Sequence, residues 1–242
     1  MAERIDDLQI KGYKLIQNPD LFCFGIDAVL LSDFAEASQE DKCIDLGCGN
    51  GIIPILMAAK TECESLTGLE IQEESVSLSQ RSVELNNLTD RITIVKGDIK
   101  EAATIFKAAS FDVITTNPPY MNENHGLVNE FTPKAIARHE LLCSLEDIVS
   151  QSAKLLRPGG KLYMIHRPHR LADLTVLLRQ YRIEPKRFRF VHPYADKEPT
   201  MVLVEALRGG KSYLKVDPPL VIYKDVNVYS DEIYRIYGST GP

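Results

Sequence analysis

The stretch Cys43-Ile44-Asp45-Leu46-Gly47-Cys48-Gly49-Asn50-Gly51 decides the fold, because a short apolar run passes directly into three glycines at alternate positions. The residues that follow, from Ile52 to Lys60, have the composition of a helix. Glycines at a strand-to-helix turn let a ligand approach the backbone where a Cβ would block it, and the first amides of the helix face the crevice. The stretch therefore predicts a nucleotide-type binding site between a strand and a helix.

The spacing of these glycines narrows the choice of ligand. A dinucleotide fingerprint of the form GxGxxG needs a third glycine or alanine at position 52, which here is Ile52. The pattern in this chain is GxGxG, and Asp45 stands two positions before the first glycine, Gly47. A carboxylate at that place would repel a pyrophosphate, whereas it suits a cofactor that carries an ammonium and a sulfonium group.

Two further apolar runs end in residues suited to the same ligand. The run 65–70 closes on Glu70, and a carboxylate at the end of the next strand can accept from both hydroxyls of a ribose. The run 92–96 leads into Gly97-Asp98-Ile99. There Asp98 can accept from an adenine amino group, and Ile99 can lie beside the ring.

The tetrapeptide Asn117-Pro118-Pro119-Tyr120 follows a fourth apolar run, 111–116. Two consecutive prolines donate no backbone hydrogen bond and hold φ near −65°, so they end the strand and fix the backbone carbonyls. The Asn117 side-chain oxygen and the Pro118 carbonyl can both accept from one planar NH2 group, while Tyr120 offers a ring face for stacking. Taken alone, the motif is also compatible with a purely structural turn at the end of a strand.

With these four motifs in this order, the chain resembles the class I S-adenosylmethionine-dependent methyltransferases over roughly residues 20 to 207. The resemblance implies S-adenosyl-L-methionine as cofactor. It also implies a Rossmann-like α/β fold, with a seven-stranded, mostly parallel sheet that has one antiparallel strand and helices on both faces. In that family the Asn-Pro-Pro-Tyr motif marks enzymes that methylate adenine N6, guanine N2 or the glutamine amide of release factors.

The resemblance assigns site residues position by position. The implied catalytic residues are Asn117, Pro118, Pro119 and Tyr120. The implied cofactor-binding residues are Phe24, Gly25, Asp45, Gly47, Gly49, Gly51, Glu70, Ile71, Asp98, Ile99 and Asn117. Asp27 is interpreted as the cap of the following helix rather than as a ligand contact.

The alternation of apolar runs and helical patterns predicts one methyltransferase domain over residues 1–242. Within it we expect an N-terminal hairpin (8–17) and cofactor-covering segment in 1–40, a catalytic core over 41–207 and an extension over 208–242. The expected strands are 42–46, 65–70, 91–96, 111–116, 160–166, 186–191 and 200–206. The expected helices are 26–36, 51–60, 73–88, 144–156 and 169–181, and a terminal strand and short helix follow residue 207.

Composition agrees with this assignment. At 242 residues and 44% apolar content, the chain can bury one full α/β core. No apolar stretch approaches the roughly 18 residues of a membrane span, and the start Met1-Ala2-Glu3-Arg4 does not resemble a signal peptide, so we expect a cytoplasmic protein without membrane contact. The five cysteines are odd in number and form no CxxC pair, which favours reduced thiols and no metal site.

Charge is divided unevenly along the chain. The net charge is −6, yet residues 1–120 hold 10 Lys or Arg against 20 Asp or Glu, and residues 121–242 hold 18 against 14. The basic half predicts contacts with RNA phosphates, although a solvated edge strand protected by charge explains part of it equally well. The candidate RNA contacts are Arg138, His139, Arg167, Arg170, Arg187 and Arg189.

The segments Phe24–Leu31 and Arg138-His139-Glu140 and the compact size most resemble the tRNA adenine-N6 methyltransferases that modify the adenosine 3′ of the anticodon in a valine tRNA. Release-factor glutamine methyltransferases normally carry an added N-terminal helical domain, and only about 40 residues precede the first core strand here. Three alternatives remain: a release-factor glutamine methyltransferase, an rRNA guanine-N2 methyltransferase and a noncatalytic S-adenosylmethionine-binding RNA scaffold. We expect a monomer or weak homodimer.

Overall fold

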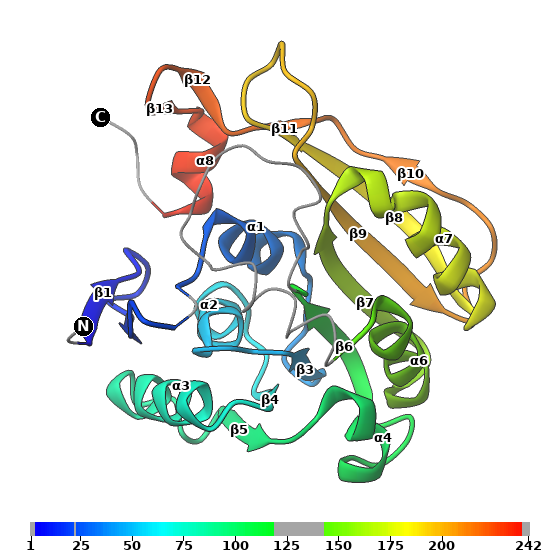
Figure 1. The fold of residues 1–242 in the computed structure, drawn as a ribbon, viewed down its shortest axis with the longest axis horizontal. Coiled ribbons are helices and arrows are strands. Elements are labelled where there is room, and N and C mark those ends of the chain that lie inside the picture. Colours follow the sequence, from blue (N-terminus) through cyan, green and yellow to red (C-terminus); the bar gives the residue numbers. More distant parts are fainter. Residues whose placement is uncertain (1–2, 22, 119–142, 239–242) are drawn as a thin grey trace.

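The computed structural model describes residues 3–21, 23–118 and 143–238 (Figure 1). A central sheet contains β3 (Lys42–Leu46), β4 (Ser65–Glu70), β5 (Ile92–Lys96), β6 (Phe111–Thr116), β7 (Leu156–His166), β8 (Ile183–His192), β9 (Met201–Arg208), β10 (Lys215–Val216) and β11 (Leu220–Val221). The helices are α1 (Ile26–Phe34), α2 (Ile52–Lys60), α3 (Glu73–Leu85), α4 (Ala102–Ile105), α6 (Leu145–Leu155), α7 (Leu171–Gln180) and α8 (Asp231–Ile236), with 3-10 turns η1 (Ile99–Glu101) and η2 (Pro168–Arg170).

The order of the sheet is β10-β8-β9-β7-β6-β3-β4-β5, with β11 also paired to β8. The strands from β7 to β5 run parallel, whereas β9 pairs antiparallel with both β7 and β8. The seven predicted strands are therefore confirmed, with one antiparallel strand among them. The strands β10 and β11, of two residues each, extend the sheet beyond that prediction.

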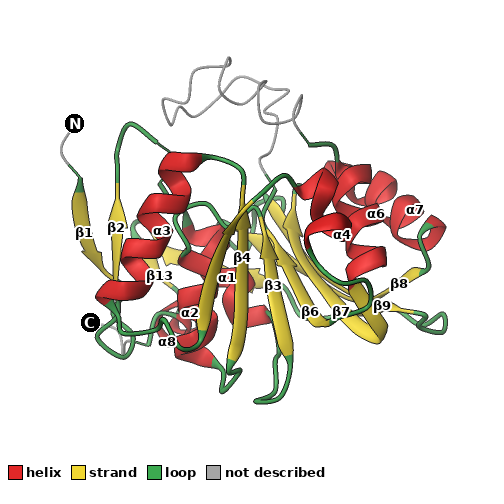
Figure 2. Cartoon of the chain, turned by 90° about the horizontal axis from the view of Figure 1, so that it is seen from below, coloured by secondary structure: helices red, strands yellow, loops and turns green. Residues whose placement is uncertain are grey.

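Helices cover both faces of the sheet, which forms the middle layer of the molecule (Figure 2). One apolar cluster joins one face to α1, α2, α3 and α8, and the other joins the opposite face to α4, α6 and α7. Within β3, Cys43 belongs to the first cluster, while Ile44 and Leu46 belong to the second. This alternation follows from the two-residue period of a strand that is buried on both faces.

Several boundaries differ from the prediction. The strand β7 begins at Leu156 rather than 160, because residues 157–160 form a bulge between the pairs Phe111–Leu156 and Val113–Lys161. Glycine is required within it: Gly159 has φ +81°, and a Cβ on Gly160 would lie 3.0 Å from the Arg157 carbonyl oxygen. The helices α1 and α3 end two and three residues earlier than predicted, at 34 and 85.

The terminal segments are hairpins. The N-terminal hairpin consists of β1 (Arg4–Asp7) and β2 (Lys14–Gln17), so residues 8–13, which were expected to begin it, form its turn. Near the C-terminus, β12 (Tyr223–Asp225) pairs with β13 (Val228–Tyr229), and α8 follows. No helix in the described ranges is both long and apolar enough to cross a membrane.

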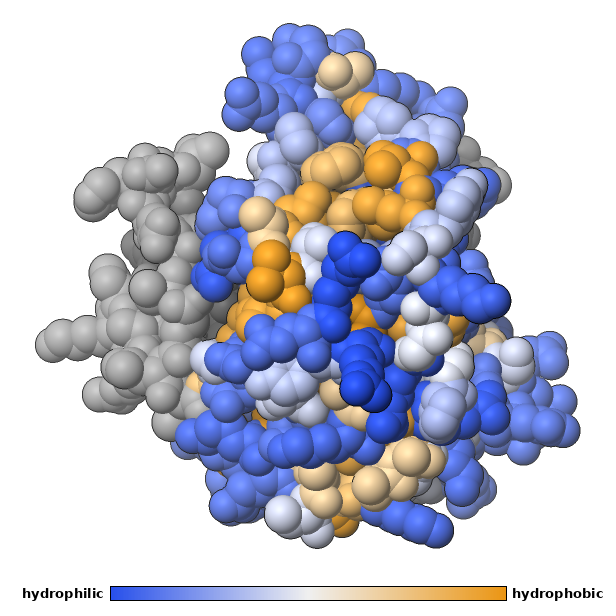
Figure 3. Space-filling view, turned by 90° about the vertical axis from the view of Figure 1, so that its right-hand side faces the viewer, coloured by the Kyte–Doolittle hydropathy of each residue, from blue (hydrophilic) through white to orange (hydrophobic). Residues whose placement is uncertain are grey.

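The side of the molecule that carries α7 and β10 shows a band of apolar surface (Figure 3). Val176 on α7 is 65% exposed, and Val216 on β10 is 57% exposed. Because β10 has only two residues, this edge of the sheet offers a short template for pairing with another chain.

Candidate functional site

Asp45 lies near the carboxyl end of β3, in the middle of the sheet, and is only 2% exposed. Its Oδ1 accepts from the Thr115 hydroxyl at 2.7 Å, whereas its buried Oδ2 has no hydrogen-bond partner within the described part of the chain. Burial is the main cause that raises the pKa of Asp45 to about 7; the Thr115 hydrogen bond opposes the rise and the Glu70 charge adds to it. A buried carboxylate oxygen without a partner is costly, unless a ligand supplies a donor.

The glycine-rich turn follows directly after β3. Gly47, Gly49 and Gly51 have φ values of +79°, +54° and +85°, in the left-handed region that glycine adopts without strain. A Cβ on Gly49 would meet nothing within 4 Å, while one on Gly51 would lie 3.0 Å from Ser79 Cβ. The backbone of the turn is therefore open to a ligand at Gly49, whereas at Gly51 it packs closely against α3.

Glu70 ends β4 beside the glycine-rich turn and is 6% exposed. Its Oε2 accepts from the Gly49 amide at 3.0 Å, and its Oε1 accepts from the Gln72 amide at 2.8 Å. The two hydrogen bonds place this carboxylate at the rim of the turn. Ile71, the next residue, is 39% exposed.

The end of β5 contributes a polar and an apolar residue. Asp98 caps η1, with its Oδ1 accepting from the Lys100 amide at 2.9 Å. The Ile99 Cδ1 atom lies 3.6 Å from the point where a Cβ of Gly47 would stand. The structure thus brings Ile99 close to the glycine-rich turn, while Asp98 is partly engaged by its own turn.

Asn117 leaves the sheet at the end of β6, next to β3. The Thr116 hydroxyl donates to the Leu46 carbonyl at 2.9 Å, which ties the ends of the two strands together. The Asn117 Nδ2 donates to Asp27 Oδ2 at 3.0 Å. Pro118 is buried. Four of the predicted site residues, Pro119, Tyr120, Arg138 and His139, lie outside the described residues.

The interpretation of Asp27 as a helix cap is wrong. Gly25 is the N-cap of α1 and forms no side-chain cap hydrogen bond, and Asp27 is the second residue of the helix. One of its oxygens accepts from the Ala28 amide at 3.0 Å, and the other accepts from Asn117. Sequence reasoning missed this contact because the two residues are 90 positions apart.

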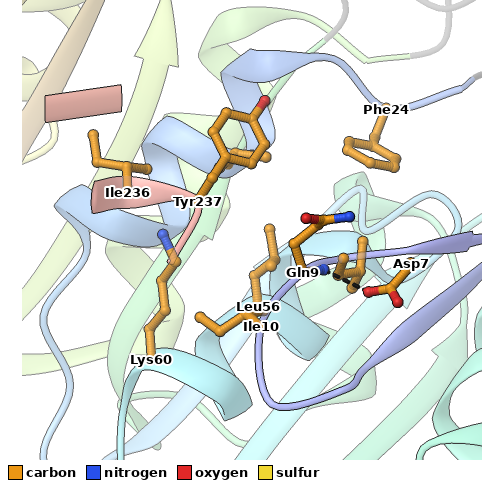
Figure 4. Close-up of a pocket in the computed structure, with 10 residues that line it drawn as sticks. Asp7, Gln9, Ile10, Phe24, Leu56, Lys60, Ile236 and Tyr237 are labelled. Carbon is orange, nitrogen blue, oxygen red and sulfur yellow. Dashed lines mark hydrogen bonds between the residues drawn. The ribbon is translucent and has the colours of Figure 1, made fainter. Parts of the chain in front are cut away.

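Phe24 lines a cavity whose described lining residues do not include the glycine-rich turn. Its backbone amide donates to the Gln17 side chain at 3.2 Å, and its ring lines a hollow of about 60 Å³ together with Leu56 and Tyr237 (Figure 4). A nucleotide-sized ligand needs a site of at least about 300 Å³, so this cavity is too small for the cofactor. A role of Phe24 in cofactor binding therefore stays a prediction from the sequence.

The predicted RNA contacts on β8 are already paired. Arg187 lies 2.7 Å from Glu205 and 3.2 Å from Glu36, and its guanidinium stacks 4.2 Å from the centre of the Phe34 ring. The Arg189 Nη2 lies 2.9 and 2.8 Å from the two carboxylate oxygens of Glu232. Both guanidinium groups are thus paired with carboxylates of the same chain, which favours a role in holding the fold over a contact with RNA.

Arg167 and Arg170 follow β7 at the same edge of the sheet as Asn117. Arg167 donates to the Thr200 carbonyl at 3.0 Å, and Arg170 forms a surface ion pair with Asp173 at 3.1 Å. The neighbouring His166 is 5% exposed, and burial, with the charge of Arg170 second, lowers its pKa to about 4. His166 opens the basic stretch 166–170, yet it is buried and neutral near pH 7 and so adds no positive charge to it.

The chain is similar to known methyltransferases in sequence and in fold. Residues 13–183 match the family described as "Methyltransferase small domain". A protein of Porphyromonas gingivalis is 28% identical over 240 residues, covering 96% of this chain and 93% of the relative, and one of Tolumonas auensis is 25% identical over 235 residues, covering 93% and 92%. Both relatives are named tRNA1(Val) (adenine(37)-N6)-methyltransferase.

Solved structures show the same fold. The crystal structure of a predicted O-methyltransferase from Agrobacterium tumefaciens has a TM-score of 0.71 and 21% identity, covering 89% of this chain and 97% of that one. A geranyl diphosphate C-methyltransferase from Streptomyces coelicolor, in complex with S-adenosyl-L-homocysteine, has a TM-score of 0.54 and 14% identity, with 75% and 74% coverage. The family match spans more than two thirds of the 242 residues, and the chain therefore belongs to the methyltransferase small domain family, as an S-adenosylmethionine-dependent methyltransferase.

Proposed function

We propose that this enzyme transfers a methyl group from S-adenosyl-L-methionine to the exocyclic N6 of an adenine in RNA, in a tRNA near the anticodon. The observation that carries the proposal is the position of Asn117 at the carboxyl edge of the sheet, directly after the strand whose Thr115 bonds the buried carboxylate of Asp45. The names of relatives that align with nearly the whole chain support valine tRNA as the substrate. A tRNA substrate also favours a cytoplasmic location.

The residues around the glycine-rich turn fit the cofactor. The Oδ2 of Asp45, which has no partner among the described residues, can accept from the ammonium group, and the bare backbone at Gly49 leaves room for the ligand. Glu70 would hold the ribose by exchanging its backbone donors for hydroxyls, and Ile99 would pack against the adenine. Gly47, Gly51, Ile71 and Asp98 complete the proposed site.

The target nitrogen is a poor nucleophile, because its lone pair is delocalised into the ring. Hydrogen bonds from its NH2 group to the Asn117 side-chain oxygen and the Pro118 carbonyl favour a pyramidal nitrogen and align it for in-line attack. When bound, the cofactor supplies an electrophilic methyl group on a sulfonium. After transfer the nitrogen is acidic enough to release a proton to water, so these residues need not act as a general base.

The target base has to leave its stack to reach Asn117. Bases in an RNA loop are already unpaired, which lowers that cost, and the proposed roles of Pro119 and Tyr120 are to fix the loop and stack on the base. Arg167 and Arg170 stand at the same edge of the sheet and can contact phosphates, since the ion pair of Arg170 is at the surface and is readily exchanged. Arg138 and His139 remain proposed RNA contacts on sequence grounds alone.

The direct test is to incubate the purified enzyme with labelled S-adenosylmethionine and total tRNA that lacks its own modification, and then to digest the RNA to nucleosides. We expect labelled N6-methyladenosine. Labelled guanosine would favour the guanine-N2 alternative. Label that appears only when a release factor replaces tRNA would favour the glutamine alternative.

A variant separates an enzyme from a noncatalytic scaffold. We expect Asn117→Ala to lose methyl transfer by about 100-fold or more, as when one group that stabilises a transition state is removed, and to bind S-adenosylmethionine normally in calorimetry. Gln39→Ala, which removes an exposed carboxamide bonded to Glu64, is the matched control and should transfer methyl groups like the wild type. Full biological activity of Asn117→Ala would indicate a scaffold.

A further inference from the structure

One hydrogen bond joins the segment that precedes the core to the proposed catalytic loop. The Asn117 Nδ2 donates to Asp27 Oδ2 at 3.0 Å, across 90 positions of sequence. Asn117 stands at the end of β6, and Asp27 stands in the first turn of α1. The contact therefore links α1 to the carboxyl edge of the sheet, where Asn117 lies. The sequence alone predicted only a helix-capping role for Asp27.

The Asp27 carboxylate is held in place on its other side as well. Its Oδ1 accepts from the Ala28 amide at 3.0 Å. A Cβ added at Gly25 would lie 2.8 Å from this same oxygen, closer than real Cβ contacts allow. A glycine at position 25 thus leaves the space into which the carboxylate folds, and the orientation of the carboxylate is fixed before Asn117 meets it.

A carboxylate only accepts hydrogen bonds, so Asn117 must turn its NH2 group toward Asp27. The amide oxygen then points to the other side of the carboxamide. The two ends of a carboxamide have nearly the same shape, and sterics alone would not choose between them. The hydrogen bond to an ionised group is also stronger than a neutral one, and it polarises the amide so that its oxygen accepts more strongly.

We propose that Asp27 is a positioning residue that fixes the carboxamide of Asn117 with its oxygen toward the target amine. The inference rests on the proposed role of Asn117 as the acceptor of that amine, and it adds the residue that orients the acceptor. It also gives the segment before the core a task in the chemical step: α1 sets the donor and acceptor pattern that the substrate meets.

The test exchanges donors and acceptors at the two positions. In Asp27→Asn the oxygen still has to accept from the Ala28 amide, so the new NH2 group faces Asn117 and forces its carboxamide to turn over. We expect kcat to fall about 100-fold, with little change in the affinity for S-adenosylmethionine. Asp27→Ala leaves the carboxamide without this constraint, and kcat should fall about 10-fold. Asp33→Asn, on the same helix, is the control and should keep wild-type kcat.

Rescue distinguishes positioning from a loss of fold. Asn117→Asp alone sets two carboxylates against each other and should be nearly inactive. The double variant D27N/N117D restores one donor facing one acceptor and keeps an oxygen for the amine, so we expect it to be at least 10-fold more active than either single variant. A double variant no better than the product of its single variants would overturn the proposal.

A second readout does not depend on the substrate. In 15N-labelled enzyme, the side-chain NH2 signal of Asn117, identified by its absence in Asn117→Asp, should shift in Asp27→Ala and stay in place in Asp33→Asn. An unchanged signal in Asp27→Ala would overturn the inference. If the wild type methylates guanine or glutamine instead of adenine, the same variants are measured with that acceptor. That result would contradict the proposed adenine substrate, but the positioning role of Asp27 would still be tested.

Discussion

The surroundings of Asp45 and of Arg187 show two ways in which a fold treats a charged side chain on a strand. At Asp45 the structure leaves one buried oxygen without a partner in the described ranges, beside a turn whose backbone is bare. At Arg187 it provides Glu205, Glu36 and the Phe34 ring within the same chain. The difference teaches that a charge indicates a ligand site when the fold leaves it unsatisfied, and indicates stability when the fold has already paired it.

Of the variants that test this difference, Asp45→Asn should have the largest effect, and the effect is on cofactor binding. We expect the affinity for S-adenosylmethionine to fall about 100-fold or more, because a neutral amide replaces the anion that faces the ammonium group. Isothermal titration calorimetry measures the loss. Glu64→Gln, which changes an exposed carboxylate near the opposite end of the sheet, is the matched control and should bind like the wild type.

The same variant should stabilise the enzyme without cofactor. Burial raises the pKa of Asp45 from 3.8 to about 7, so its ionised form is costly in the folded chain, and the cost develops as the pH rises from about 4 to 7. At pH 8 we expect Asp45→Asn to raise the Tm by about 4 °C in calorimetric scans. An unchanged Tm together with unchanged binding would show that Asp45 is satisfied by the protein itself.

The pH dependence of cofactor binding is the next effect in size. Below pH 7 Asp45 gains a proton and loses its attraction for a cation, since its pKa is about 7. The dissociation constant should therefore rise by nearly 10-fold between pH 7.5 and pH 6, measured by calorimetry at constant ionic strength. Asp45→Asn should bind weakly and equally at both values. If the wild type binds the cofactor equally well at pH 6 and pH 7.5, Asp45 does not contact the cofactor.

The smallest expected effect on ligand binding separates the arginines. Arg170→Ala should weaken tRNA binding about threefold and lower the salt dependence by roughly one phosphate contact. Arg187→Met should leave tRNA binding unchanged but lower the Tm by about 5 °C, because it removes one of the two cations beside the largely buried Glu205 and the stacking on the Phe34 ring. Filter binding at two salt concentrations and thermal scans measure both. A loss of RNA affinity in Arg187→Met would restore that residue as an RNA contact.

Local patterns predicted most of the fold. The β4 and β6 strands have the predicted bounds, and β3 does as well, because each is an apolar run bounded by turn residues. The start of β7 was wrong, since Pro158 and two glycines read as a turn while the chain forms a bulge that keeps its pairing with β6. The strands β10 and β11 have two residues each, too few for any periodic signal.

In the candidate site, too, the sequence predicted the local features and missed the contacts between distant residues. Glycine spacing and the position of Asp45 before it are local, and the structure brings them together with Glu70, Ile99 and Asn117 at one edge of the sheet. The ion pair of Arg189 had no signal in the sequence, because its partner Glu232 lies 43 positions away and becomes a neighbour only when the C-terminal segment folds back. The contact between Asp27 and Asn117 had no signal in the sequence for the same reason.

The sequence by itself determined the strand-to-helix turn, the family resemblance and the order of the motifs, because these depend on backbone conformation and on residues close together in the chain. Only the tertiary structure decided which charges are satisfied. It leaves Asp45 with a buried oxygen that lacks a protein donor in the described ranges, gives Arg187 and Arg189 carboxylate partners, and sets Asp27 against Asn117. The physical reason is that hydrogen bonds and ion pairs act over a few ångströms of space, irrespective of the distance along the chain.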